Sequence, residues 1–219
     1  MGDGVFQIVD AQAAGRLGDW LATRRGVYRA SGLLNADVPD PYVDRYDDYS
    51  VHLLAVDMDT ASIVGTSRLI LRDGDARPLQ VEAQFGVIPE ARSVEISGFA
   101  IQEAYRDGLA SLGLIRGLIE SAREHDAEMI YAEVEPWFLA SLQTVGFPLT
   151  QITEPQWFYN AWNLVAVASV DGFFQGVAEA WRRGGHDLVT AYFSHPYDGT
   201  VHTRHLTPAQ RTSESRELA

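Results

Sequence analysis

The sequence predicts a mixed α/β (α+β) domain in which a mostly antiparallel, twisted sheet is flanked by helices on both faces. Two β-rich runs, 50–57 and 61–71, follow one another across a short polar turn, which is typical of an antiparallel hairpin. A long amphipathic helix, 107–125, lies between the strand-like runs 92–102 and 127–134, which indicates a strand–helix–strand crossover. A chain of 219 residues is long enough to bury the core of one such domain.

The first part of the chain combines a helix with an acidic arm. Residues 10–30 carry apolar side chains at helical spacing, and residues 31–48 hold five aspartates between glycine and proline residues, which is typical of a loop or arm. We expect residues 1–206 to form a single domain, in which 1–49 are the N-terminal helix and arm. The polar residues 207–219 are expected to be a disordered tail.

The second half continues with alternating helices and strands. Pro136 is typical of the first turn of a helix, and Gly146 marks where that helix stops. The runs 147–152 and 159–170 are expected to be strands. Asp171 is expected to be the N-cap of a last amphipathic helix.

The composition excludes several kinds of chemistry and partner. The chain has no cysteine and all 17 of its basic residues are arginine, so it forms no disulfide, thiolate nucleophile or lysine Schiff base. A net charge of −13 disfavours nucleic acid as a partner. No apolar run reaches the roughly 20 residues of a membrane span, and we see no signal peptide, so we expect a cytoplasmic protein. His202 and His205 have no acidic ligand in register, so we expect no metal site.

A polar turn, residues 105–110, precedes the long helix. Unpaired backbone N–H groups at a helix N-terminus bind anions, and Gly108 and Ala110 leave that backbone approachable. The guanidinium of Arg106 can pair with phosphate. The segment is therefore either an ordinary strand-to-helix turn or the binding site for the phosphate of a pantetheine arm.

This turn resembles that of the GNAT acyltransferase superfamily, whose long helix opens with Gln/Arg-x-x-Gly-x-Gly/Ala. Here Tyr105-x-x-Gly108-x-Ala110 keeps the glycine and alanine, and Arg106 follows the first position of the motif by one residue. The helix 137–147 with its Gly-Phe ending is also similar to that family. The resemblance implies a GNAT-like fold that binds a pantetheine thioester, with no permanently bound cofactor.

From its N-terminus the chain also resembles acyl-homoserine-lactone (autoinducer) synthases and N-acyl amino acid synthases, a GNAT-like branch that takes acyl groups from acyl carrier protein. Four motifs carry this resemblance in the family's order over residues 15–170. They are Arg24-x-x-x-Tyr28, Asp44-Arg45-Tyr46-Asp47, Gly65-Thr66-Ser67-Arg68-Leu69 and Glu95-Ile96-Ser97-Gly98-Phe99.

Three positions depart from the autoinducer synthases. Leu34 stands where that family has Trp, Tyr42 where it has Glu, and Gly98 where it has Arg. In the family these residues help to form the pocket for S-adenosylmethionine and to hold the N-terminal arm. We therefore expect acylation of another amine, such as an amino acid, rather than lactone formation.

Glu95 is the candidate base, with Ser97 as a second catalytic candidate. An amine attacks a thioester only when it is unprotonated, and a carboxylate can accept its proton directly or through a water. Partial burial would raise the pKa of Glu95 toward that use. The alternative is a structural pair with an arginine such as Arg68, and Ser97 could equally be a satisfied sheet hydroxyl. Alternation along this strand predicts one face with Glu95, Ser97, Phe99 and Ile101 and the other with Val94, Ile96 and Ala100.

The remaining site residues form four expected groups. The resemblance implies that the backbone of Phe99, Ala100 and Ile101 binds the oxyanion and the pantetheine. The phosphate would lie at Arg106, Gly108 and Ala110. The amine pocket would be formed by Arg24, Tyr28, Asp44, Asp47 and Arg68. Arg68, if buried in its strand, needs an acidic partner, for which Asp44 or Asp47 is the candidate. Trp137, Phe138, Leu142 and Trp162 would line an acyl pocket, unless they are simply core.

These expectations combine into an N-acyltransferase that moves a fatty acyl group from acyl carrier protein or CoA to the amine of a small molecule. Two alternatives remain. The protein could be an autoinducer synthase that still takes S-adenosylmethionine, or a non-catalytic module that binds an acyl chain or a partner. The sequence does not specify the donor or the oligomeric state.

Overall fold

A computed structural model describes residues 5–34, 43–106, 109–184 and 187–202. Its strands are β1 (Phe6–Asp10), β2 (Ser50–Asp57), β3 (Ile63–Leu71), β4 (Ser93–Ile101), β5 (Met129–Val134), β6 (Thr150–Gln151), β7 (Gln156–Phe158), β8 (Ala161–Ser169) and β9 (Thr200–Val201). Its α-helices are α1 (Leu17–Ala30), α2 (Gln80–Phe85), α3 (Leu109–Glu124), α4 (Pro136–Thr144), α5 (Val170–Arg182) and α6 (Leu188–Phe193). Two 3-10 turns are η1 (Asp47–Tyr49) and η2 (Glu103–Tyr105).

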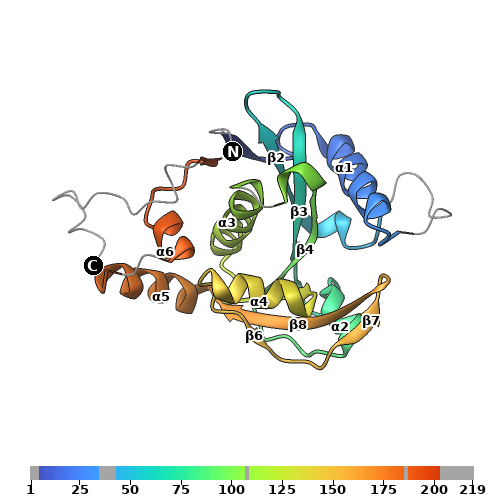
Figure 1. Cartoon of the computed structure of the whole chain (residues 1–219). Coiled ribbons are helices and arrows are strands. Elements are labelled where there is room, and N and C mark those ends of the chain that lie inside the picture. The colour runs from blue at the N-terminus through green and yellow to red at the C-terminus, as the bar shows by residue number, and fades with distance from the viewer. Residues whose placement is uncertain (1–4, 35–42, 107–108, 185–186, 203–219) are drawn as a thin grey trace.

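The described strands form one mixed sheet in the order β6-β8-β5-β4-β3-β2-β1-β9, with β7 paired to β8. Strands β4 and β5 pair in parallel, and the other pairs are antiparallel. Helices α1 and α3 lie on opposite sides of β2, β3 and β4 (Figure 1). The expected fold class, a mostly antiparallel sheet between helices, is confirmed. None of the described helices is long and apolar enough to cross a membrane.

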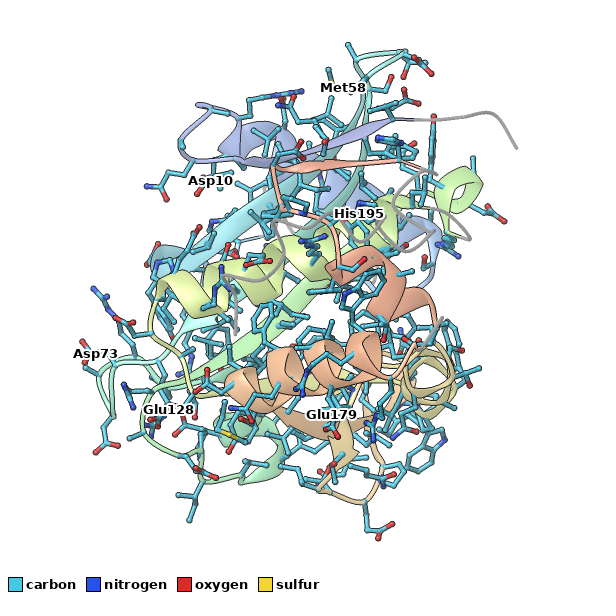
Figure 2. The ribbon with its side chains drawn as sticks, turned by 90° about the vertical axis from the view of Figure 1, so that its left-hand side faces the viewer. Asp10, Met58, Asp73, Glu128, Glu179 and His195 are labelled. Carbon is cyan, nitrogen blue, oxygen red and sulfur yellow. The ribbon has the colours of Figure 1, made fainter. Side chains whose placement is uncertain are left out.

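The main hydrophobic core lies between the sheet and α3. Leu114 and Leu118 are fully buried there and recur at helical spacing, so one face of α3 packs on β2 and β3. Gly117 lets β1 approach closely, because a Cβ at this position would lie 3.0 Å from Ile8 Cγ2. Helix α5 contacts α3 on the same side of the sheet, as Figure 2 shows. This core fixes the strands from which the site is built.

The opposite face of the sheet is covered by α1 and α2. Trp20 of α1 is fully buried against Leu54 and Val56 of β2. Leu79 and Val81, at the start of α2, pack with apolar residues of β3, β5 and β8. The short helix α2 is held at its start by Glu82, whose side chain accepts a hydrogen bond from the backbone N–H of Leu79 at 2.7 Å.

Most elements expected from the sequence occur with small shifts, but several short ones were missed. The chain at Phe6–Asp10 forms β1 because it pairs with β2, so the first helix begins at Leu17 rather than at residue 10. Helices α2 and α6 and strands β7 and β9 were not expected. The N-cap expected at Asp171 is wrong. Ser169 is the N-cap, because its hydroxyl accepts the backbone N–H of Gly172 at 3.1 Å, and Asp171 lies in the first turn.

A bulge in β4 corrects the predicted facing of that strand. The register with β3 shifts between Thr66 and Arg68, opposite Gly98, whose φ is +61°. Phe99 and Ile101 therefore pack toward the α3 core, on the side that Val94 occupies before the bulge. The expectation that they share a face with Glu95 is wrong, because simple alternation does not continue through an extra residue.

Strands β4 and β5 separate beyond the first half of β4. Their parallel pairing runs from Ser93 with Met129 to Ile96 with Ala132. Residues 97–101 of β4 continue to pair with β3, but no described strand pairs with them on the other side. On that side this second half of β4 has no strand partner in the described part of the chain, and it lies next to the side chains of the candidate site.

Candidate active site

Glu95 is the most buried acidic residue of the candidate site. Its side chain points to the face covered by α2, where Glu95 Oε2 accepts a hydrogen bond from the backbone N–H of Val81 at 3.0 Å. The residue is 0% exposed, and its Oε1 is buried without a hydrogen-bond partner among the described residues. Burial, together with the nearby charge of Glu133, raises the pKa of Glu95 to about 8, whereas the Val81 N–H and Arg68 oppose the shift. Glu95 can therefore exchange a proton near neutral pH.

Gln80, the first residue of α2, connects the basic and acidic parts of the site. Its side-chain oxygen accepts a hydrogen bond from Arg68 Nη2 at 3.1 Å, and its Nε2 donates to Glu133 Oε2 at 3.0 Å. The same nitrogen lies 3.5 Å from the hydroxyl of Tyr159, which also accepts from Gln84 at 2.8 Å. Helix α2 thus holds side chains from β3, β5 and the β7–β8 turn in one network.

Glu133 is a second acidic residue at this place. It lies on β5 two residues after Tyr131, which pairs in register with Glu95, so Glu133 shares the Glu95 face of the sheet. Burial raises the pKa of Glu133 to about 7, and the hydrogen bond from Gln80 opposes that shift. Its side chain is only partly buried, whereas that of Glu95 is inaccessible. The two carboxylates therefore differ in their access to solvent.

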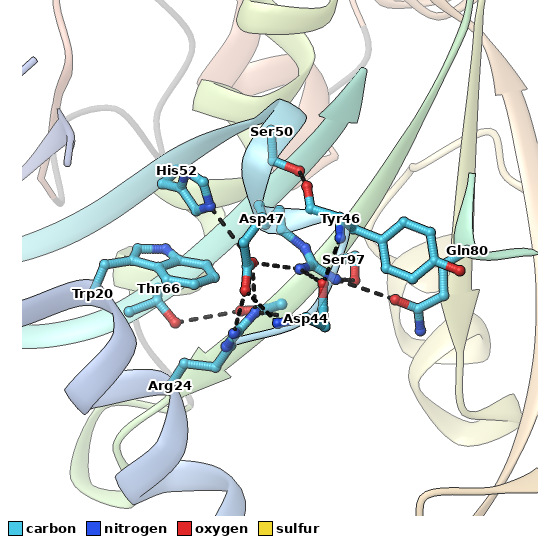
Figure 3. A network of polar contacts seen from close by, with 12 residues as sticks. Trp20, Arg24, Asp44, Tyr46, Asp47, Ser50, His52, Thr66, Gln80 and Ser97 are labelled. Carbon is cyan, nitrogen blue, oxygen red and sulfur yellow. Dashed lines mark hydrogen bonds and ion pairs between the residues drawn. The ribbon is translucent and has the colours of Figure 1, made fainter. Parts of the chain in front are cut away.

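A network of ion pairs joins the arm to the sheet (Figure 3). Asp47 binds Arg24 of α1 through Nη2 at 2.9 Å and binds Arg68 of β3. Asp44 binds Arg68 Nη1 at 2.7 Å, and His52 Nε2 lies 3.6 Å from Asp47. Burial alone would raise the pKa of Asp47, but hydrogen bonds from His52 and Arg24 and the charge of Arg68 hold it well below its usual value. Both arginines are buried, so the arm is fixed by two compensated charges.

This network shows which acidic residues pair with Arg68, a point that the sequence left open. Arg68 uses Nη1 for Asp44 and Asp47, and Nη2 for Gln80 and the hydroxyl of Ser97 at 3.2 Å. Its acidic partners are therefore Asp44 and Asp47 together. No ion pair between Arg68 and Glu95 occurs in the described part of the chain. Tyr28, one turn after Arg24 on α1, is partly buried.

Trp20 occupies the space next to Gly98. Its indole N–H donates a hydrogen bond to the carbonyl of Ser67 at 3.0 Å. The Arg24 guanidinium lies over its ring, with Cζ 4.3 Å from the ring centroid. A Cβ on Gly98 would lie 3.0 Å from Arg68 Cβ and 3.3 Å from Trp20 Cζ2. Gly98 stands where the autoinducer synthases have an arginine. Its positive φ and the closeness of Arg68 and Trp20 both favour glycine at this position.

The second half of β4 directs two N–H groups away from β3. Gln102 donates its backbone N–H to the carbonyl of Val64 at 2.9 Å. Because backbone groups alternate along a strand, the N–H groups of Ile101 and Phe99 point to the other side, where β5 has already separated. Ala100 is buried and pairs with Thr66. This is the part of β4 that the resemblance predicted to bind pantetheine and an oxyanion.

The expected phosphate end is only partly described. Gly108 lies outside the described residues, and Ala110 is fully buried in α3. The exposed Arg106 donates from Nη2 to the hydroxyl of Ser31 at 2.8 Å and from Nε to the carbonyl of Ile101 at 3.3 Å. Its guanidinium therefore lies between the end of α1 and the end of β4.

Three of the expected acyl-pocket residues, Trp137, Phe138 and Leu142, lie together on α4, whereas Trp162 of β8 packs against Trp157. Leu142 is buried in the main core, and Phe138 packs against Phe99 with ring centroids 5.9 Å apart. Trp137 and Trp162 are 63% and 57% exposed. Phe138 is the member that the structure places beside β4.

Two residues of the site, Gln80 and Glu133, were not expected from the sequence. Glu133 had a usable signal, because alternation along 127–134 puts it on the same face as Tyr131. Gln80 had none, because it falls at the end of a segment that the sequence describes as a loop. A surface pocket lined by Arg72, Ser93 and His125 lies at the opposite end of β4 and contains none of the expected site residues. The described residues contain no group of three or more His, Cys, Asp or Glu side chains that could hold a metal ion.

One family model matches part of the chain. Residues 24–116 match the family described as acetyltransferase (GNAT) domain. The matched segment begins at Arg24, contains Glu95 and the second half of β4, and ends within α3. This part of the chain therefore matches a GNAT domain, and the match and the fold together support an N-acyltransferase. No curated protein sequence matches the chain.

Solved structures with the same fold include two kinds of synthase. The CoA-dependent acyl-homoserine lactone synthase BjaI with MTA is 21% identical, with a TM-score of 0.61 over 83% of this chain and 90% of that one. The AHL synthase LasI is 15% identical, with a TM-score of 0.63 over 80% and 95%. FeeM, an N-acyl amino acid synthase from uncultured soil microbes, is 15% identical, with a TM-score of 0.58 over 79% and 94%. At these identities the likeness establishes the fold.

Proposed function

We propose that the protein transfers an acyl group from a pantetheine thioester, carried by coenzyme A or by acyl carrier protein, to the amine nitrogen of a small acceptor. One observation carries this proposal. A buried carboxylate with a raised pKa, Glu95, lies where β4 leaves β5, next to the outward N–H groups of Phe99 and Ile101.

The expected mechanism uses these groups in sequence. The thioester carbonyl would lie against the second half of β4, and a backbone N–H of Phe99 or Ile101 would stabilise the oxyanion of the tetrahedral intermediate. One preorganised donor of this kind contributes roughly 3–4 kcal/mol to catalysis. Glu95 would accept the proton of the attacking amine through a water or a neighbouring polar group, since its own side chain is inaccessible.

The arm would form the other side of the amine pocket. Asp44, Asp47 and Arg68 are fixed by their mutual ion pairs, and Ser97 accepts a hydrogen bond from Arg68. Arg106 would meet the phosphate of the pantetheine arm. Phe138, beside Phe99, would contact the start of the acyl chain.

The test is amine-dependent release of thiol. We would incubate the protein with octanoyl-CoA or octanoyl acyl carrier protein and a panel of amino acids and simple amines. A thiol reagent would follow the reaction, and mass spectrometry would identify the acyl product. Rates with the two donors decide which carrier is used. Failure of every amine to accelerate thiol release from either donor would contradict the proposal and favour a non-catalytic module.

The same assay includes S-adenosylmethionine as an acceptor. A lactone product would appear together with methylthioadenosine, which makes this outcome easy to distinguish. We expect no such product, because Gly98 and Trp20 fill the place where the autoinducer synthases have an arginine.

A further inference from the structure

Glu133 is more exposed to solvent than Glu95, and exposure decides which carboxylate a substrate can contact. Glu95 is 0% exposed and is covered by the start of α2, whereas Glu133 is only partly buried. Both side chains lie on the same face of adjacent parallel strands, and Glu133 is one side-chain step closer to the end where β4 and β5 separate. An acceptor that enters from that end reaches Glu133 first.

Gln80 fixes the position of Glu133. The amide of Gln80 points its oxygen at the Arg68 guanidinium, 3.1 Å away, and its nitrogen at the Glu133 carboxylate, 3.0 Å away. The opposite orientation of the amide would place donor against donor and acceptor against acceptor. The hydrogen bond from Gln80 engages Oε2 of Glu133, so the carboxylate is oriented while it keeps further acceptor capacity.

Among the described residues no arginine forms an ion pair with either of these two carboxylates, although the charge of Arg68 acts on Glu95. Arg24 and Arg68 are ion-paired with Asp47 and Asp44. Glu95 Oε1 is buried without a hydrogen-bond partner among the described residues, and Glu133 is near enough that its charge raises the pKa of Glu95. A buried, unpaired acceptor atom beside a second carboxylate is costly unless a donor arrives.

We infer that Glu133 binds the acceptor as its ammonium cation, with Glu95 as the buried carboxylate behind it and Gln80 as the positioning residue of Glu133. This inference rests on the proposed acyl transfer and adds the form in which the acceptor binds. A primary ammonium group supplies three N–H donors, and Glu133 keeps acceptor capacity for one of them beside its hydrogen bond from Gln80.

The proposed transfer begins with the bound ammonium form of the acceptor. The ammonium gives one proton to the carboxylate pair, and the freed lone pair of nitrogen forms the C–N bond to the thioester carbonyl carbon. When the tetrahedral intermediate collapses, the C–S bond breaks and its electron pair stays on sulfur. A second proton leaves nitrogen and ends on that sulfur. The products are an amide, a thiol and one proton, which the carboxylate pair releases to solvent.

The experiment compares Glu133→Gln with wild type, using isoamylamine, tyramine, L-leucine and L-tyrosine as acceptors and octanoyl-CoA or octanoyl acyl carrier protein as donor. Exposed Glu154→Gln is the matched control, because it removes one acidic charge outside the site. We expect Glu133→Gln to raise KM for the best amine at least tenfold and to leave KM for the thioester within twofold. Glu133→Asp should recover part of the loss.

A neutral probe separates ammonium binding from general damage to the pocket. Isoamyl alcohol and 4-(2-hydroxyethyl)phenol replace the ammonium of isoamylamine and tyramine with a hydroxyl, and their inhibition constants should change less than twofold in Glu133→Gln. An unchanged KM for every amine in Glu133→Gln would overturn this inference and leave the acyltransferase intact. Absence of transfer by wild type to any amine would instead overturn the proposed function and this inference with it.

Discussion

The carboxylate of Glu95 accepts a hydrogen bond from the backbone N–H of Val81 at 3.0 Å, so the first turn of α2 covers the candidate base. Val81 is itself fully buried, and this contact joins a six-residue helix to the centre of the sheet. The hydrogen bond stabilises the ionised form of Glu95, whereas burial and Glu133 oppose it. The balance of these effects predicts how stability and activity depend on pH.

Stability should decrease between about pH 5 and pH 8. Burial raises the pKa of Glu95 from 4.5 to about 8, so the folded protein keeps a proton that the unfolded chain has already released. Each pH unit in that window therefore costs up to about 1.4 kcal/mol of unfolding free energy for one such group. Glu95→Gln should reduce the loss between pH 5 and pH 8 by up to about 4 kcal/mol, measured by urea denaturation at these two pH values. Glu154→Gln should behave like wild type, and an equally steep loss in Glu95→Gln would contradict the assignment.

Below pH 4 the arm should be lost first. The pKa of Asp47 is held well below its ordinary value by His52, Arg24 and Arg68, against the effect of burial. A carboxyl with a lowered pKa contributes stability above its ordinary pKa of 3.8, and this contribution disappears as the pH falls further. Together with the Glu95 effect, this places maximum stability near pH 5.

The rate of transfer should depend on pH through the same carboxylates. A base must be ionised to accept a proton, so kcat/KM should rise with pH through the range of about 7 to 8 that the pKa values of Glu133 and Glu95 define. In Glu133→Gln the like charge is gone, the pKa of Glu95 falls, and the residual rise should move to lower pH by about 0.5 to 1 unit. Initial rates across pH 5.5 to 9 with saturating donor would measure this. If the rise of kcat/KM in Glu133→Gln occurs at the same pH as in wild type, or at higher pH, the charge of Glu133 does not raise the pKa of Glu95.

The sequence predicted the sheet well because its central strands are long and strongly patterned. The runs 50–57 and 61–71 became β2 and β3 with little change, since an almost continuous apolar run fits strands that are covered on both faces. The four-motif resemblance also grouped Arg24, Asp47 and Arg68, and in the structure Asp47 forms ion pairs with both arginines.

The parts that the sequence did not predict depend on tertiary contacts. Strand β1 has five residues and is stable only as a partner of β2 and β9. Helix α2 has six residues, too few for a periodic signal, yet it supplies Gln80 to the site. The bulge at Gly98 turns the side chain of Phe99 to the other face of the sheet. A single glycine within a strand is not a sufficient sequence signal to predict this change.

Breaking the centre of the arm network should destabilise the protein. In Asp47→Asn, buried Arg24 loses its ion pair at 2.9 Å, and of the acidic partners that the structure describes Arg68 keeps Asp44. We therefore expect a loss of about 2–3 kcal/mol and a Tm decrease of about 5–10 °C. The control is Asp19→Asn, which removes the exposed pair with Arg16, 2.9 Å apart, and should cost less than about 1 kcal/mol. Thermal unfolding followed by circular dichroism measures both. Equal Tm values for the two variants would show that the buried network does not hold the arm.

Alanine substitutions at Gly98 and Gly74 distinguish two contributions to the free energy of unfolding, backbone strain and steric crowding. Gly98 and Gly74 both have positive φ, +61° and +52°, so alanine at either position should cost about 1 kcal/mol through the backbone. At Gly74 nothing lies within 4 Å of the added Cβ, whereas at Gly98 it meets Arg68 Cβ at 3.0 Å and the ring of Trp20. We therefore expect Gly98→Ala to lose about 2–3 kcal/mol in urea denaturation, against about 1 kcal/mol for Gly74→Ala. Gly98→Ala should also lower the rate of acyl transfer, because the bulge aims the N–H groups of Phe99 and Ile101, while Gly74→Ala should keep it. If the two variants lose equal stability and keep equal rates, the bulge does not position the reacting strand.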